Sequence, residues 1–278
     1  MQNNPPETNK KSDRFRPGTL PRSLCIALSM YSRIPVPQIR WDETPMKNAL
    51  CFLPLIGGVI GGAELCWYLL ARHFVLSGWL FAALATAIPV LITGGIHLDG
   101  FMDTHDALAS YGEPEKRHAI LKDPHTGAFA VIHACLYFLL TAAFFAHVYE
   151  KGGGRDIAAI AVGYVISRGI CACSIVLCKC ARDSGLASLF QNGAGKKSVL
   201  ISQVLILSIA VGAWIWLLPI TAFVTLLLIF IVCMHFRVSV LKKFHGITGD
   251  LAGYLLTRVE LTAALGVVVG MTWNLCIV

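Results

Sequence analysis

Charged residues are scarce in this sequence. Only 14% of its 278 residues are Asp, Glu, Lys or Arg, whereas 56% are hydrophobic, and this composition lies far outside the range of soluble domains. Beyond the polar stretch 1–19, we find no soluble domain, no low-complexity linker and no clear repeat. We therefore expect a flexible tail over 1–19 and a single transmembrane domain over 20–278.

Acidic residues are fewer than basic ones, 16 against 23, which gives a net charge of +7. A basic excess can indicate nucleic-acid binding. Here it lies mostly in the N-terminal tail and in the loops beside hydrophobic runs, where membrane orientation and anionic lipid account for it. We therefore expect a lipid bilayer and no nucleic acid among the partners.

Long hydrophobic runs are abundant. A run of about 20 apolar residues crosses roughly 30 Å of hydrocarbon. Seven runs are long enough, of which the fifth and sixth are separated only by the region of Pro219: 50–71, 75–96, 127–149, 157–178, 199–218, 220–236 and 259–278. The predicted fold class is all-α, a polytopic integral membrane bundle of about seven transmembrane helices.

The Lys and Arg residues in the connections predict the orientation, because they are retained on the cytoplasmic side. The connections on the side of the N-terminal tail carry 19 of them and those on the other side carry 3. This ratio predicts a cytoplasmic N-terminus in the cell (inner) membrane, with the loop 97–126 on the cytoplasmic side.

The apolar stretch SLCIALSMYS lacks a small-residue cleavage site and runs into Arg33 and Pro35, so we do not expect a removed signal peptide. We interpret it as an amphipathic or re-entrant segment at the cytoplasmic face.

Acids gather in the stretch GGIHLDGFMDTHDALAS, residues 94–110. In a helix, Asp99, Asp103 and Asp106 would be spaced i, i+4 and i+7 on one stripe, where like charges repel unless a proton or a cation neutralises them. Carboxylates suit Mg²⁺ or Mn²⁺. The stripe therefore predicts a divalent-metal site, and a solvated loop whose acids cap the helix is the alternative.

Residues near the stripe fit supporting roles. Gly100 allows a substrate or a backbone to come close, and His97 is placed to orient a ligand or to move a proton. Farther on, Lys122 and Asp123 precede Pro124. Asp123 fits either the N-cap of a helix that begins at Pro124 or a contact to metal or substrate.

Two further loops carry glycines and charged residues that suit phosphate oxygens, namely CARDSGLASLFQNGAGKK with Arg182 and HGITGD with Asp250. Arg168, Glu64 and Glu260 fall within predicted spans, where a charge is either paired or functional. For Arg168, a buried ion pair and an anion contact are both open.

The motifs resemble those of a known family. HLDGFMDTHDAL followed by ILKDPHTGAFAV closely resembles the hallmark region of cobalamin synthases, the adenosylcobinamide-GDP ribazoletransferases, which runs H-x-D-G-x-x-D-x-x-D and then K-D-x-x-x-G. Five further segments match in order: SRIPVP at 32–37, PLIGGVIG at 54–61, SR at 167–168, ARDSGLASLF at 181–190 and GITGDLAG at 246–253. The departures are Ser32 for Thr, Ala107 for the frequent Gly, and His105 within the stripe, and none removes an aspartate.

The resemblance implies an enzyme of the last steps of cobalamin synthesis. A hydroxyl of α-ribazole or α-ribazole 5′-phosphate attacks the phosphoryl group on the cobinamide of adenosylcobinamide-GDP, and GMP leaves. Such a transfer needs neutralisation of charge, which a metal held by carboxylates supplies. The transmembrane domain over 20–278 is then the catalytic domain, with an acidic active site at the cytoplasmic face.

Roles follow for the candidate residues. We expect Asp99 and Asp103 to hold Mg²⁺, Asp106 to serve as metal ligand or general base, and His97 to orient a ligand or transfer a proton. The candidates for substrate contacts are Arg33, Lys122, Arg168 and Arg182 for phosphate oxygens, Asp123 for a metal or substrate contact, and Asp250 for a further metal or ribose contact.

Two other classes of membrane protein are alternatives to this family. CDP-alcohol phosphotransferases use a similar acidic stripe, but their D-x-x-D-G-x-x-A-R order is missing here. A secondary transporter would have paired broken spans, which are not seen. Gly57 and Gly61 form a small-x-x-x-small face that fits packing within one chain or between two, with a slight preference for a homodimer.

Overall fold

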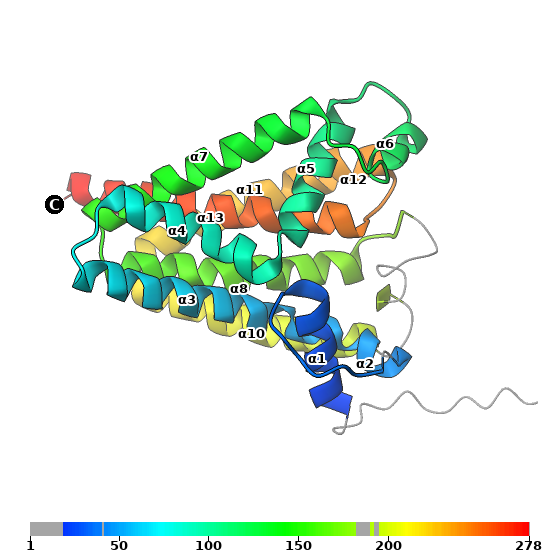
Figure 1. Cartoon of the computed structure of the whole chain (residues 1–278), viewed down its shortest axis with the longest axis horizontal. Coiled ribbons are helices and arrows are strands. Elements are labelled where there is room, and N and C mark those ends of the chain that lie inside the picture. The colour runs from blue at the N-terminus through cyan, green and yellow to red at the C-terminus, as the bar shows by residue number, and fades with distance from the viewer. Residues whose placement is uncertain (1–18, 41, 182–189, 192–194, 278) are drawn as a thin grey trace, which may run out of the picture.

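A computed structural model describes residues 19–40, 42–181, 190–191 and 195–277 (Figure 1). In this part of the chain every element longer than an isolated bridge is a helix, as predicted. The elements are α1 (Leu20–Tyr31), α2 (Glu43–Lys47), η2 (Ala49–Phe52), α3 (Leu53–His73), α4 (Gly78–Thr93), α5 (Ile96–Ala109), α6 (Pro114–Ile120), α7 (Ala128–Lys151), α8 (Gly154–Leu177), α10 (Gly195–Leu217), α11 (Pro219–His235), η3 (Phe236–Val240), α12 (Leu241–Phe244) and α13 (Gly249–Ile277).

Among the described residues, six helical stretches are long and apolar enough to cross a membrane. They are Ala49–His73, Ala128–Lys151, Gly154–Leu177, Gly195–Leu217, Pro219–Phe244 and Gly249–Trp273. These correspond to six of the seven predicted spans, and the break at Pro219 does separate two of them. The chain is therefore a multi-pass helical bundle of the predicted class.

The predicted span 75–96 differs from the others. Its helix, α4, has 16 residues and ends at Thr93, and α5 leaves it at an angle of 96°. The cause is the pair Gly94 and Gly95, whose φ angles of 69° and 81° lie in the left-handed region that glycine adopts readily. Only the bent pair of α4 and α5 taken together would count as a seventh span.

Helices α8 and α13 run side by side through the middle of the bundle, with α3 and α10 along one side and α7 and α4 along the other (Figure 1). They are also the most buried of the spans. A Cβ on Gly61 would lie 2.8 Å from the carbonyl oxygen of Ala161, and one on Gly57 would clash with that of Tyr164. The glycine face of α3 is thus occupied by α8 of the same chain, and it no longer favours a homodimer.

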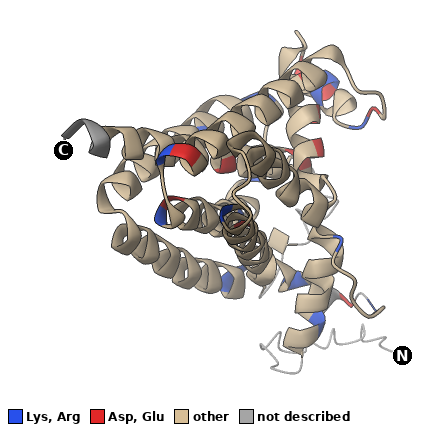
Figure 2. Cartoon of the chain, turned by 60° about the vertical axis from the view of Figure 1, so that its left-hand side comes forward, with Lys and Arg blue, Asp and Glu red and all other residues tan. Residues whose placement is uncertain are grey.

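Charged residues gather toward the ends of the bundle, and the long helices between them are mostly uncharged (Figure 2). The outward sides of α7, α10 and α11 carry exposed apolar residues, among them Leu139, Ile201 and Phe230, which suits contact with lipid. Helix α1 buries Ile26 and Ala27 and leaves Arg22 in solvent, so the stretch predicted to be amphipathic forms a short helix against the bundle.

Candidate active site

The acidic stripe lies where α5 crosses the beginning of α13. A Cβ on Gly100 would lie 2.7 Å from the carbonyl oxygen of Asp250, and one on Gly253 would lie 3.2 Å from that of His97. Only a residue without a side chain allows backbones to approach this closely. The glycine in the D-G step of the sequence therefore brings Asp250 beside the stripe.

Helix α5 places the three aspartates on one side, as the spacing predicts. Asp99 is exposed, whereas Asp103 and Asp106 are half-buried. Partial burial raises the pKa of Asp103 to about 6, and the nearby carboxylates of Asp99, Asp250 and Asp106 add to the shift. Like charges are thus gathered around Asp103, and Asp250 from another helix is one of them.

Asp106 has a structural task that the sequence did not reveal. Its carboxylate accepts hydrogen bonds from the backbone N–H of Gly127, at 2.6 Å, and of Ala130, at 2.9 Å. These groups belong to the first turn of α7, so Asp106 caps that helix from 21 residues away. Asp106 is therefore a half-buried helical residue that caps a different helix, and not part of a solvated loop. Asp99 and Asp103 are left for other partners.

The predicted cap at Asp123 is wrong. Helix α7 begins at Ala128 after Gly127, not at Pro124. Asp123 instead accepts a hydrogen bond from the backbone N–H of His125, and its carboxylate lies 2.7 Å from Nδ1 of that residue. These contacts lower the pKa of Asp123. Lys122 is exposed in the same loop.

A hollow of about 270 Å³ lies beside the stripe. It is lined by Gly94, Gly95, Ile96, Leu98, Asp99 and Met102. The side chain of Arg33 packs on Gly94, and its backbone N–H donates to the carbonyl of Ile92. The bend between α4 and α5 thus places the Arg33 side chain against Gly94, which lines the hollow together with the exposed carboxylate of Asp99. This neighbourhood suits the phosphate contact predicted for Arg33.

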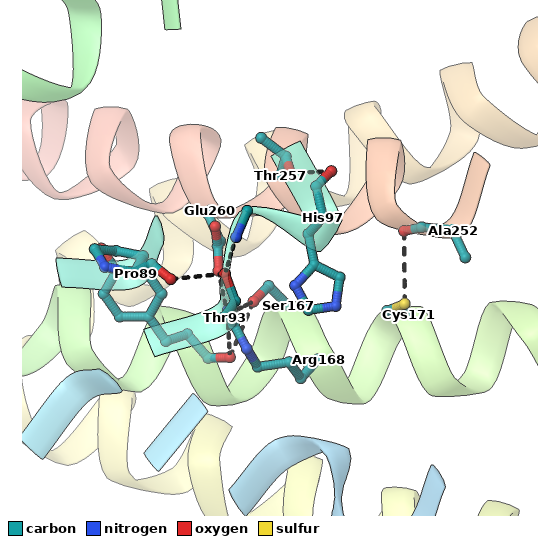
Figure 3. Close-up of polar contacts among 11 residues, drawn as sticks. Pro89, Thr93, His97, Ser167, Arg168, Cys171, Ala252, Thr257 and Glu260 are labelled. Carbon is teal, nitrogen blue, oxygen red and sulfur yellow. Dashed lines mark hydrogen bonds and ion pairs between the residues drawn. The ribbon is translucent and has the colours of Figure 1, made fainter. Parts of the chain in front are cut away.

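Arg168 lies inside the bundle. It is 1% exposed and forms an ion pair with Glu260 of α13, and it also donates to the carbonyl of Tyr164 (Figure 3). Of the two roles open for Arg168, the structure shows the buried ion pair. His97, on α5, also points into the bundle and lies next to Arg168 (Figure 3). Its ring stacks on that of Tyr31, with 6.2 Å between the ring centroids. The proton-transfer role of His97 stays a prediction.

One histidine near the stripe was missed. The ring of His133 on α7 stacks on that of His105, with centroids 3.6 Å apart. The sequence contains a signal for this residue, because His133 is a polar residue within a predicted membrane span, where polar side chains are often functional.

The loops that carry the remaining motifs meet at the same end of the bundle. The backbone N–H of Ile247 donates to the carbonyl of Lys179, and that of Ala181 donates to the carbonyl of Ile247. This pairing joins the segment after α8 to the segment before α13, close to Asp250. Arg182 lies outside the described residues.

The donor set fits a divalent cation in part. In the described part of the chain, no three His, Cys, Asp or Glu side chains come together as a ready metal cage. Magnesium, however, commonly takes one or two carboxylates and completes its shell with water and substrate phosphate. The crowded carboxylates of Asp99, Asp103 and Asp250 suit that mode.

Comparisons with known proteins show which family the chain is related to. The family model described as cobalamin-5-phosphate synthase matches residues 23–268. The chain belongs to this family. It is 44% identical to the adenosylcobinamide-GDP ribazoletransferase of Lachnoclostridium phytofermentans over 89% of this chain and 93% of that protein. It is 34% identical to the enzyme of the same name from Clostridium perfringens over 88% and 96% of the two chains. No solved structure matches.

Family membership confirms the resemblance seen in the motifs. It also decides against a CDP-alcohol phosphotransferase and a secondary transporter. The matched region begins within α1 and ends within α13, so it includes every helix between these two.

Proposed function

We propose that this chain transfers the cobinamide phosphoryl group of adenosylcobinamide-GDP to α-ribazole or α-ribazole 5′-phosphate, with release of GMP, at the end of the bundle where α5 crosses α13. The observation that carries the proposal is the gathering of Asp99, Asp103 and Asp250 around that crossing, in a chain whose relatives bear the name of this reaction. The product is adenosylcobalamin or its 5′-phosphate.

In this transfer, the bond from the acceptor oxygen to phosphorus forms as the bond to the GMP oxygen breaks. The acceptor hydroxyl loses its proton, and negative charge grows on the leaving phosphate. A Mg²⁺ or Mn²⁺ ion held by Asp99 and Asp103, with Asp250 beside them, supplies neutralisation of that charge when bound.

Other residues position the reactants. Arg33, at the hollow beside Asp99, binds a phosphate oxygen of the donor. Asp106 keeps the start of α7 against α5, because both its oxygens already accept backbone hydrogen bonds, and so we assign it to positioning rather than to the general base. Lys122 lies in the exposed loop between α6 and α7 and is the further phosphate contact.

The site faces the cytoplasm of a cell with the chain in its inner membrane. The support is the excess of Lys and Arg, 19 against 3, on the side of the N-terminal tail. Helices α1, α6 and α12 and the start of α13 lie at one end of the bundle, together with α5 (Figure 1). Substrates made in the cytoplasm then reach the site without crossing the bilayer.

The test is GMP release from adenosylcobinamide-GDP by the purified protein, comparing the parent with Asp103→Asn. The variant removes one of several repelling carboxylates, so it should be as heat-stable as the parent without Mg²⁺ and should gain less stability when Mg²⁺ is added. Its turnover should fall by about a hundredfold, the order expected when a main electrostatic element of a transfer reaction is lost.

Glu115→Gln is the matched control, because Glu115 is an exposed carboxylate at the same end but outside the stripe. It should keep parental turnover. If Asp103→Asn also turns over at nearly the parental rate, the metal site is wrong. If the parent releases no GMP with either acceptor, the proposed reaction is wrong.

A further inference from the structure

A second hollow, of about 310 Å³, opens at the same end of the bundle and is lined by basic side chains. Lys179, Arg237 and His245 come to it from three separate elements. The remaining lining residues are Leu177, Cys178, Leu241 and Gly246. None of the described residues that line it is acidic.

The backbone around this basic hollow is held in unusual conformations. Arg237 lies on the π-helical turn η3, which widens the helix between α11 and α12, and such turns recur at functional sites. His245 has a φ of 54°, in the left-handed region that residues other than glycine seldom adopt. A Cβ on Gly246 would lie 2.6 Å from the carbonyl oxygen of Lys179, so the corner fits tightly against the segment after α8.

Among the described residues, no acidic side chain pairs with the permanent positive charges in the basic hollow. Within the described ranges, neither Lys179 nor Arg237 forms an ion pair. Salt bridges would be the ordinary use of such residues. Two permanent cations that share one hollow repel each other, and an anion with several oxygens relieves that repulsion while accepting hydrogen bonds from both.

The basic hollow is also tied to the acidic site. The hydrogen bond of 2.8 Å from the N–H of Ile247 to the carbonyl of Lys179 fixes the hollow to the segment that leads into α13. Asp250, in the first turn of that helix, follows Gly246 by four residues. The hollow is therefore joined, through this short segment, to the helical turn that carries Asp250.

We propose that Lys179, Arg237 and His245 form a phosphate-binding subsite that anchors a phosphate group of a substrate, apart from the phosphoryl group that reacts. The proposal rests on the proposed function. Phosphate of this kind has two sources in the reaction, the 5′-phosphate of the acceptor and the phosphate of the donor that leaves with GMP. A subsite for the 5′-phosphate would make the phosphorylated acceptor the preferred one.

The experiment uses Lys179→Gln, Arg237→Gln and the double variant, with Lys242→Gln as the control, because Lys242 is exposed on α12 but does not line the hollow. KM is measured for α-ribazole 5′-phosphate, for α-ribazole and for adenosylcobinamide-GDP. We expect each single variant to raise one KM at least about tenfold and the double variant to raise it further, with kcat little changed, because a charge-assisted hydrogen bond is lost.

The pattern identifies the source of the phosphate. A rise for α-ribazole 5′-phosphate with none for α-ribazole assigns the subsite to the acceptor. A rise for adenosylcobinamide-GDP with either acceptor assigns it to the donor phosphate that leaves with GMP. No selective rise in an active enzyme, or an equal rise in Lys242→Gln, overturns the subsite.

A binding measurement separates this proposal from the proposed reaction. Inorganic pyrophosphate should raise the melting temperature of the parent and of Lys242→Gln, but not that of the double variant. This holds even if the parent releases no GMP. Equal protection of the parent and the double variant overturns the subsite.

Discussion

The chain holds carboxylates in two very different places. At the crossing of α5 and α13, Asp99 and Asp103 are exposed or half-buried and stand beside other acids. In the middle of the bundle, Glu64 and Glu260 are 0% and 8% exposed. Water or a cation can satisfy the first group, whereas the second group depends on protein partners alone.

The buried group is short of partners. Arg168 pairs with Glu260, while neither carboxylate oxygen of Glu64 has a hydrogen-bond partner within the part of the chain that the structure describes. Glu64 and Glu260 are near enough to interact electrostatically. The acids at the crossing are thus gathered where a ligand can reach them, whereas the acids inside the bundle must be neutralised by the protein itself. The variants described next test both groups.

The largest effect should come from breaking the buried ion pair. Arg168→Ala leaves Glu260 buried without its counter-charge, which costs about 3–5 kcal/mol in a buried pair. Arg168→Lys keeps the charge but not the planar guanidinium, so it should be less harmful. Thermal unfolding in detergent measures both.

The double variant Arg168→Met, Glu260→Gln provides the control for this prediction. It removes both charges and should recover much of the stability that Arg168→Ala loses. If Arg168→Ala melts like the parent, the ion pair contributes nothing and the burial argument fails.

The comparison also shows what could be predicted from sequence. The spans, the acidic stripe and the presence of Arg168 in a helix follow from hydrophobic runs and from helical spacing, which are local properties. The partner of Arg168 does not, because Glu260 lies 92 residues away and two in-span acids were available. Packing, not spacing, selects between them.

The caps and the bend illustrate the same limit. The Asp-Pro step suggested a helix start at Asp123, but α7 takes its cap from Asp106 on α5, a tertiary contact with no local signature. The bend at Gly94 and Gly95 was open to prediction, since two adjacent glycines end a helix readily. The length of the apolar run concealed it.

A smaller effect should come from Asp106, which differs from its neighbours on the stripe. Asp106→Asn keeps one acceptor oxygen but turns an NH₂ group toward a backbone N–H of α7, so stability should fall by about 1–2 kcal/mol, the range for a lost cap. Its thermal stabilisation by Mg²⁺ should stay near that of the parent, unlike that of Asp103→Asn. A loss of the Mg²⁺ response in Asp106→Asn would instead make Asp106 a ligand.

The smallest effect should come from Glu64→Gln. An ionised carboxylate buried at this depth would require a counter-charge, and among the described residues Glu64 has neither an ion pair nor a hydrogen bond, while Arg168 pairs with Glu260. A neutral amide of nearly the same shape replaces the side chain without opening a cavity. The free energy of unfolding, measured by thermal melts, should therefore change by no more than it does for an ordinary surface substitution, roughly 0.5 kcal/mol.

Glu64→Ala is the matched variant, because it removes the same group but leaves a void between α3 and α8, and it should lose clearly more stability. GMP release should be near parental in Glu64→Gln, since the residue lies in the bundle and not at the acidic crossing. A large loss of stability in Glu64→Gln would show that the charge itself is paired, and the two groups of acids would then differ only in depth.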